Sequence, residues 1–358
     1  MKFKLLGNSG LRVSEMALGA MTFGSDWGWG ADDKESRRIF DTYVDRGGNF
    51  IDTANQYTEG TSERLVGEFA KEKRERLVIA TKYSLSTREG DPNSGGNHRK
   101  SMVRSTEESL RRLKTDYIDL LYLHIWDNTT PVEEVLRGMD DLARSGKVVY
   151  VGISDTPAWQ VSRMQAIAEL RGWAPLIALQ IEYSLAQRTV ERELIPMATE
   201  MGLGVIPWSP LAGGVLTGKY SRADLKQGAP SANPAGTRKN VALAHNMLNE
   251  RNLAIADVVQ QVAKEIARPA SQVALAWVLL NPAVTAPIIG ARTTKQLEDN
   301  LLAVEVKLTE DQRARLESVS ATDLGFPHDL LALPIVRQVL FRDIPIPTRR
   351  RGQARSAA

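Results

Sequence analysis

Apolar residues recur along this chain in two patterns: at a period near 3.6 residues in some segments, and as short continuous runs in others. Asp32 can cap a helix with Glu35 three residues later, and Gly47 can end that helix before an apolar run at 49–51. The same order recurs at 130–153, where Thr130 opens a second predicted capping box. A helix followed by a buried strand is therefore the predicted repeating unit.

Eight apolar runs are predicted as buried strands, most of them about 30 residues apart, as β-α-β units require. The runs are 16–18, 49–51, 77–80, 118–123, 148–153, 176–181, 204–207 and 286–289. Segments 2–7 and 11–16 predict a hairpin ahead of the first strand. Eight strands alternating with helices predict an α/β fold of the (β/α)₈ type, a TIM barrel. A doubly wound sheet is the alternative, although no Gly-x-Gly-x-x-Gly motif follows any predicted strand.

The 358 residues exceed the length that such a barrel needs, which is about 250 residues. The surplus falls at 84–97, at 209–251 and beyond 321. Because the two internal stretches follow strands, we expect them on the C-terminal face. We predict one barrel domain at 1–320 and a C-terminal extension at 321–358. The extension could partly cover the barrel mouth, pack elsewhere on the protein or contact another subunit, and its Pro- and Arg-rich end is expected to be mobile.

The amino-acid composition limits the kinds of partner that we expect this protein to bind. The net charge is +3 from 46 basic and 43 acidic residues, which are interspersed, so nucleic acid is not an expected partner. The absence of cysteine removes disulfides and thiolate metal sites, and no metal is expected. No apolar run is long enough to span a membrane, and the first apolar residues break at 7–10 before a signal peptide could form. We expect a cytoplasmic protein with a small-molecule substrate and no membrane partner, and a homo-oligomeric state stays open.

Ionisable residues follow consecutive predicted strands. Asp52 closes the second strand, Lys82 the third and His124 the fourth, while Tyr57 lies in the loop after Asp52. If the four meet, Asp52 would keep Lys82 charged, and Lys82 would lower the pKa of the Tyr57 phenol from about 10 toward neutrality. A neutral His124 could orient the same substrate oxygen. This chemistry predicts reduction of a carbonyl group, with the hydride supplied by a cofactor.

These residues resemble the catalytic tetrad of the aldo-keto reductase superfamily, a (β/α)₈ barrel family that uses NADPH. The matching motifs are Asp52-Thr53-Ala54-x-x-Tyr57, Thr81-Lys82 and Leu123-His124, and the resemblance covers roughly residues 3–320. It implies an alcohol:NADP+ oxidoreductase in which Tyr57 is the general acid, assisted by Lys82, Asp52 and His124.

The resemblance also implies a binding site for NADPH/NADP+. Its expected nicotinamide contacts are Ser154, Asp155, Gln180 and Trp208. The expected pyrophosphate segment contains Ser209, Pro210, Leu211, Gly213 and Lys219, and the expected adenosine site contains Gly290, Arg292, Gln296, Asp299 and Asn300. Asp155 stands where many relatives have Asn, which replaces an amide by an acceptor-only carboxylate. Arg292, at the start of a predicted helix, suits a 2′-phosphate and favours NADPH over NADH.

Aromatic residues in the predicted loops suggest the substrate. Trp27, Trp29, Tyr83 and Trp126 could line a pocket for an apolar or bulky cyclic carbonyl compound. Two alternatives remain open from the sequence. Barrels similar to this one serve as nucleotide-binding regulatory subunits of membrane channels. Lys82 could also form a Schiff base, as in an aldolase, although the cofactor motifs would then be unexplained.

Overall fold

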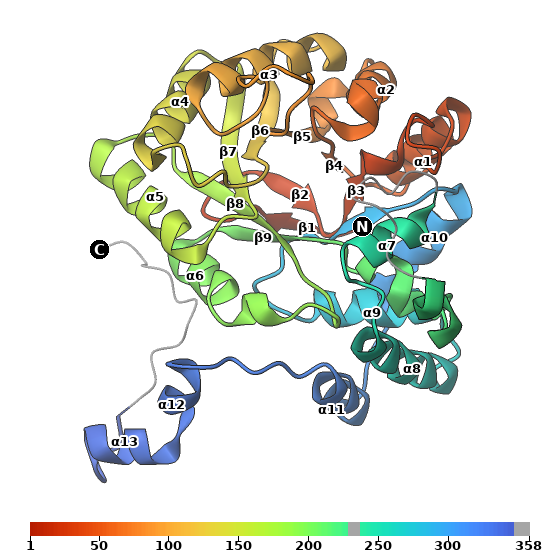
Figure 1. The fold of residues 1–358 in the computed structure, drawn as a ribbon, viewed down its shortest axis with the longest axis vertical. Coiled ribbons are helices and arrows are strands. Elements are labelled where there is room, and N and C mark those ends of the chain that lie inside the picture. The colour runs from red at the N-terminus through yellow and green to blue at the C-terminus, as the bar shows by residue number, and fades with distance from the viewer. Residues whose placement is uncertain (228–236, 347–358) are drawn as a thin grey trace.

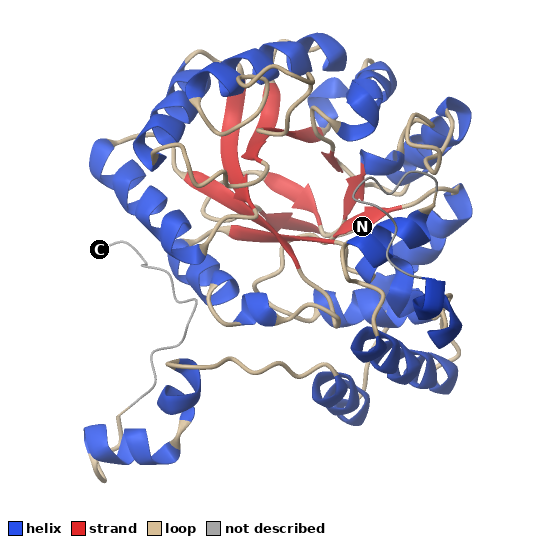
Figure 2. Ribbon diagram, viewed as in Figure 1, coloured by secondary structure: helices blue, strands red, loops and turns tan. Residues whose placement is uncertain are grey.

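The computed structural model of the chain describes residues 1–227 and 237–346. Its centre is a sheet of eight parallel strands surrounded by helices (Figures 1 and 2). The strands are β3 (Ala17–Gly19), β4 (Phe50–Asp52), β5 (Val78–Tyr83), β6 (Ile118–Leu123), β7 (Val148–Ser154), β8 (Leu176–Glu182), β9 (Gly204–Trp208) and β10 (Ile288–Gly290). Each corresponds to one of the eight predicted apolar runs.

The sheet closes almost completely into a barrel. Its strand order is β10-β3-β4-β5-β6-β7-β8-β9, so each strand pairs with its neighbour in sequence except at the β10–β3 seam. At the other seam, Val205 of β9 pairs with Val284 just before β10, and the Thr285 N–H donates to the Val205 carbonyl at 2.9 Å. The predicted (β/α)₈ barrel is therefore confirmed, and the doubly wound alternative is wrong.

The helices form an outer ring around the barrel (Figure 2). The ring contains α1 (Asp33–Asp45), α2 (Thr61–Ala70), α3 (Arg99–Leu113), α4 (Val132–Arg144), α5 (Ala158–Arg171), α6 (Leu194–Met201), α8 (Glu250–Glu265), α9 (Ala270–Leu279) and α10 (Thr294–Leu301). Helix α7 (Arg238–Ala244) packs on the turn at 212–217, and α11 (Glu310–Val319) packs on α8. Asp32 caps α1 as predicted, since its side chain accepts from the Glu35 N–H at 2.8 Å. The capping box predicted at Thr130 is wrong, because the Thr130 hydroxyl donates instead to the Asp127 carboxylate at 2.8 Å.

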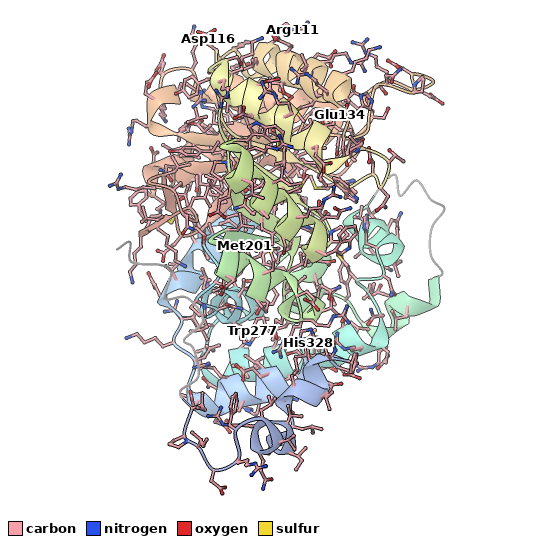
Figure 3. All side chains as sticks on the ribbon, turned by 90° about the vertical axis from the view of Figure 1, so that its left-hand side faces the viewer. Arg111, Asp116, Glu134, Met201, Trp277 and His328 are labelled. Carbon is pink, nitrogen blue, oxygen red and sulfur yellow. The ribbon has the colours of Figure 1, made fainter. Side chains whose placement is uncertain are left out.

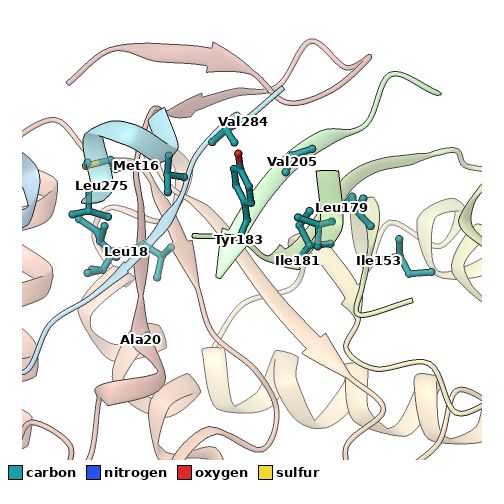
Figure 4. Packing of buried hydrophobic residues seen from close by; sticks show 14 of the residues in the cluster. Met16, Leu18, Ala20, Ile153, Leu179, Ile181, Tyr183, Val205, Leu275 and Val284 are labelled. Carbon is teal, nitrogen blue, oxygen red and sulfur yellow. The ribbon is translucent and has the colours of Figure 1, made fainter. Parts of the chain in front are cut away.

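Strand side chains alternate between two apolar clusters. One cluster lies between the strands and the ring of helices and includes Leu18, Leu179 and Ile181, which Figure 4 shows packed with residues from other elements. The other lies inside the barrel and includes Phe50 and Ala80. Because the strand period is two, residues in phase with Phe50 and Ala80 point into the barrel.

The N-terminal hairpin covers one end of the barrel. Strands β1 (Phe3–Leu5) and β2 (Arg12–Ser14) pair antiparallel, as predicted. Leu6, just after β1, and Val13, in the middle of β2, are fully buried in the inner cluster. The inner cluster therefore fills the N-terminal end, and the polar residues of the strand ends lie toward the opposite end.

The C-terminal extension leaves the ring of helices. Helices α12 (His328–Ala332) and α13 (Pro334–Phe341) extend away from the barrel in two perpendicular views (Figures 1 and 3), and neither contains a buried residue. The His328 imidazole lies 2.9 Å from the Glu193 carboxylate, beside the start of α6. Covering of the barrel mouth by the extension stays a prediction. Most of the end predicted to be mobile, residues 347–358, lies outside the described residues.

None of the helices formed by residues 1–227 and 237–346 combines the length and apolar character needed to cross a membrane.

Candidate active site

The polar residues at the strand ends share the inward phase of the barrel. Asp52 follows Phe50 by two residues on β4, and Lys82 follows Ala80 by two on β5. His124 stands two residues after the inward-facing Tyr122, just beyond β6. Parallel pairing places these strands side by side in the order β4-β5-β6. The alternation of the strands therefore brings the three side chains to one end of the barrel.

Lys82 is the centre of this cluster. Its ammonium group donates to the Asp52 carboxylate at 2.5 Å, to the Thr53 carbonyl at 2.8 Å and to the Tyr57 hydroxyl at 3.2 Å. The Lys82 side chain is fully buried. Three acceptors match the three donors of an ammonium group. The second Asp52 oxygen accepts from the Gln180 amide at 2.8 Å.

Tyr57 reaches the cluster from the turn η2 (Tyr57–Gly60), which follows β4. Thr58 anchors this turn, because its hydroxyl donates to the Phe23 carbonyl at 2.8 Å and accepts from the Ser62 N–H at 3.0 Å. The Tyr57 oxygen accepts from Lys82, so its own O–H can donate to another group.

The pKa shifts follow burial and the neighbouring charges. Burial acts to lower the pKa of Lys82, but the charges of Asp52 and Tyr57 and the hydrogen bonds to both together outweigh it, and the net pKa is raised. Burial raises the pKa of Tyr57, against the lowering effect of Lys82. The predicted lowering of the phenol pKa toward neutrality is therefore wrong. The prediction neglected Asp52, whose charge opposes that of Lys82, and took too small a penalty for burial.

His124 is a neutral neighbour of Tyr57. The two ring centroids are 5.8 Å apart with the planes at 80°, an edge-to-face contact. Burial, with a smaller contribution from Lys82, holds the pKa of His124 well below 6.5. Its Nδ1 atom is buried and has no hydrogen-bond partner among the described residues. At neutral pH, His124 can therefore serve as a hydrogen-bonding group without charge.

The residues expected at the nicotinamide lie on β7, β8 and β9. Ser154 ends β7, and its buried hydroxyl has no hydrogen-bond partner within residues 1–227 and 237–346. The Asp155 carboxylate accepts from the Trp208 indole N–H at 3.0 Å, although the two residues are 53 positions apart. Gln180 belongs to the buried cluster through its bond to Asp52.

The residues expected at the pyrophosphate follow β9. Those expected at the adenosine run from the end of β10 into α10. Ser209 and Gly213 follow β9 and have positive φ angles of 47° and 63°. Lys219 is exposed. Arg292 is also exposed, and its backbone N–H donates to the Gln296 side chain at 2.9 Å. Pro210 and Asn300 are buried, and Leu211, Gly290 and Asp299 lie on the same segments.

The four aromatic residues expected in the substrate pocket occupy different places. Trp27 is half-buried and lies 6.4 Å from the Tyr57 ring, and Trp29 packs 5.7 Å from Trp27. Trp126 is only 7% exposed and belongs to the outer cluster. Tyr83 is not a pocket residue. It follows the inward-facing Lys82 and therefore points outward, where it is fully buried and its hydroxyl donates to the Asn97 carbonyl at 3.2 Å.

Glu182 was missed by the sequence analysis. It ends β8 two residues after Gln180 and pairs in register with Trp208. Burial, and then the charge of Asp155, raise the pKa of Glu182 to about 7. Burial raises the pKa of Asp155 to about 6, although its bond from Trp208 opposes the shift. The alternation from Gln180 to Glu182 could have identified this carboxyl group.

Comparison with known proteins identifies the family. The sequence model of the Aldo/keto reductase family matches residues 15–321. The chain belongs to this family. As an aldo/keto reductase, it is an oxidoreductase, which agrees with the prediction from the strand-end residues.

Several relatives of this aldo/keto reductase are similar over most of their length. An aryl-alcohol dehydrogenase [NADP(+)] of Phanerodontia chrysosporium is 37% identical, over 91% of this chain and 87% of the relative. A norsolorinic acid reductase of Aspergillus flavus is 36% identical, over 91% of this chain and 83% of the relative. The oxidoreductase YrpG of Bacillus subtilis is 40% identical, over 87% of this chain and 93% of the relative.

Proposed function

We propose that this aldo/keto reductase interconverts an aromatic or bulky cyclic carbonyl compound and its alcohol, with NADPH/NADP+ as the cofactor. The observation that carries the proposal is the contact between the Tyr57 hydroxyl and the buried Lys82–Asp52 pair. Such a pair places a fixed positive charge where negative charge develops on the phenol as it gives up its proton.

In the direction of reduction, Tyr57 donates its proton to the carbonyl oxygen. The raised pKa of Tyr57 keeps the phenol protonated at neutral pH, so the donor is ready before substrate binds. Lys82 then stabilises the phenolate that remains, and Asp52 holds Lys82 in place with one oxygen. The neutral His124 can donate or accept a hydrogen bond at the same substrate oxygen and so orient the carbonyl.

The bound cofactor would supply the hydride to the carbonyl carbon. The residues present fit a nicotinamide. The Ser154 hydroxyl is buried with no partner in the described part of the chain and can bond a carboxamide, and the half-buried Trp208 ring offers an aromatic face. Arg292, exposed at the start of α10, suits a 2′-phosphate, and the NADP(+)-dependent relative supports this choice of cofactor.

The environment of Lys82 argues against a Schiff-base aldolase. A lysine nucleophile needs a lowered pKa and a free lone pair. The pKa of Lys82 is raised by Asp52 and Tyr57, and its ammonium donates to three acceptors. We therefore assign Lys82 to stabilising Tyr57 rather than to covalent chemistry.

Two observations support an aromatic or bulky cyclic substrate. Trp27 stands beside Tyr57 with its ring at 77° to the phenol, and so provides an apolar wall close to the proton donor. The relatives named for aryl alcohols and norsolorinic acid support an aromatic ring in the substrate. An apolar wall favours such a compound over a phosphorylated sugar.

A titration of the purified protein with NADPH and, separately, NADH tests the proposal. Intrinsic tryptophan fluorescence should be quenched by NADPH at micromolar or lower concentrations, because Trp208 would stack on the nicotinamide. NADH should bind much more weakly. A panel of aromatic aldehydes and ketones would follow. If calorimetry as well as fluorescence detected neither nucleotide, the proposed function would be wrong.

A further inference from the structure

The bond between Asp155 and Trp208 joins two strands that are not neighbours. Asp155 follows β7 and Trp208 ends β9, with β8 between them. The Asp155 carboxylate accepts from the indole N–H at 3.0 Å. The bond therefore crosses the end of β8 at the mouth of the barrel, beside the residues assigned to the nicotinamide.

The backbone of Asp155 is held in an uncommon conformation by its neighbours. Its φ angle is +40°, in the left-handed region. Its N–H donates to the Gln180 carbonyl at 3.3 Å, and its carbonyl accepts from the Trp126 N–H at 3.4 Å. Left-handed backbone at a residue other than glycine is uncommon and is worth tracing to a cause. Here the conformation accompanies the carboxylate contact with Trp208.

The Trp208 indole needs such a partner. The side chain is only half-buried, so one face can receive a ligand. A tryptophan side chain rotates about two bonds, and its N–H commonly finds an acceptor when buried. A fixed acceptor at one edge of the ring selects one rotamer and so sets the plane of the exposed face.

We infer that Asp155 is a positioning residue, which fixes the plane of the Trp208 ring through the indole N–H and so prepares the surface on which the nicotinamide would stack. The inference rests on the proposed function for the identity of the ligand. It gives Asp155 a role other than direct contact with the carboxamide, and leaves Ser154, whose hydroxyl is buried, to make that contact. An acceptor at residue 155 is sufficient for the role, so Asn should be able to replace Asp.

Three variants of the full-length protein test the inference. Asp155→Gly deletes the acceptor and, unlike Asp155→Ala, adds no strain at the positive φ angle. Asp155→Asn keeps an acceptor and tolerates the left-handed backbone. Trp208→Phe keeps an aromatic ring but removes the N–H. Far-ultraviolet circular dichroism and thermal unfolding verify that each variant folds.

The first readout needs no nucleotide. The near-ultraviolet circular dichroism of wild type minus Trp208→Phe isolates the signal of the ordered indole. Asp155→Gly should lose most of this signal, and Asp155→Asn should retain it. An unchanged signal in Asp155→Gly, or an equal loss in Asp155→Asn, would overturn the inference. This result is obtained even if the protein binds no nicotinamide nucleotide, in which case the proposed function fails separately.

The second readout is the dissociation constant for NADPH, with kcat measured separately. Asp155→Gly should raise the dissociation constant about tenfold, the size expected for one hydrogen bond to a charged group. In the Trp208→Phe background, the same change should have little further effect, because the N–H is already absent. A loss of the same size in both backgrounds would show that Asp155 does not act through Trp208, and would overturn the inference.

Discussion

The two ends of the proposed cofactor and substrate site are built differently. At β4 and β5, Asp52 and Lys82 are buried and bonded to each other, to Tyr57 and to Gln180. At the start of α10, Arg292 is exposed. The polar cluster around Lys82 is thus held by contacts within the protein, whereas a ligand would provide the partner for the Arg292 side chain.

This difference predicts different consequences of mutation. A change in the polar cluster around Lys82 leaves a buried polar group without its partner, so it should affect folding as well as chemistry. A change at Arg292 removes an exposed charge, so it should affect binding alone. Measuring both the unfolding free energy and the activity of each variant therefore tests whether the two ends differ in this way.

Tyr57→Phe should have the largest effect. The phenyl ring cannot donate a proton, and general acid catalysis contributes about 10²- to 10⁴-fold to rate. We expect kcat to fall by that factor while the dissociation constant for NADPH changes less than about twofold. Stopped-flow measurement of NADPH oxidation with an aromatic aldehyde gives kcat. Tyr83→Phe is the matched control, because this tyrosine faces outward and its hydroxyl donates to the Asn97 carbonyl. A Tyr57→Phe enzyme with nearly full activity would remove Tyr57 from the role of acid.

Lys82→Met should be the most destabilising of these changes. It leaves the buried Asp52 carboxylate without its cation, and breaking one partner of a buried pair costs about 3–5 kcal/mol of unfolding free energy. Urea denaturation measures this loss. The double variant Asp52→Asn with Lys82→Met should recover much of it, because no unpaired charge remains. A Lys82→Met variant as stable as wild type would mean that the polar cluster around Lys82 does not stabilise the barrel.

The sequence predicted the parts of the site that depend on local pattern. The eight strands follow from apolar runs, and the strand-end positions of Asp52, Lys82 and His124 follow from those strands. It did not predict the outward direction of Tyr83, although the period of two was available from Lys82. Because Lys82 was predicted to face into the barrel, the alternation of strand side chains already implied that the next residue, Tyr83, faces outward.

Other features could not be predicted because they depend on tertiary structure. The bond from Trp208 to Asp155 needs the register of β7, β8 and β9, which apolar runs do not specify. The sign of the Tyr57 pKa shift depends on the balance of burial against the charges of Lys82 and Asp52. Residue types alone identify the charged groups that act on Tyr57, but not whether its pKa rises or falls.

Arg292→Ala tests the exposed end of the proposed site, at the start of α10. A charge-assisted bond to a 2′-phosphate contributes about 1.5–3 kcal/mol, so the dissociation constant for NADPH should rise about 10- to 100-fold. NADH, which lacks that phosphate, should be nearly unaffected, and so should the unfolding free energy. Arg46→Ala is a suitable control, since Arg46 is exposed and contacts Glu298 on α10 at 3.1 Å. Equal losses for NADPH and NADH would show that Arg292 does not recognise the 2′-phosphate.

Glu182, at the end of β8, should give the smallest effect, one that depends on pH. Burial raises its pKa from an ordinary value of 4.5 to about 7, so the folded protein holds this proton more tightly than the unfolded chain. Its contribution to the unfolding free energy therefore falls as pH rises from about 4.5 to about 7, and levels off above. Glu182→Gln removes this loss, and should be more stable than wild type by about 1–3 kcal/mol at pH 8 but equal to it at pH 4. Thermal unfolding at both pH values measures the difference.

Adding Asp155→Asn to Glu182→Gln should reduce the gain in stability at pH 8, because the charge of Asp155 is part of the cause of the raised Glu182 pKa. A Glu182→Gln variant with the same relative stability at both pH values would place Glu182 with the exposed outer end rather than with the buried cluster.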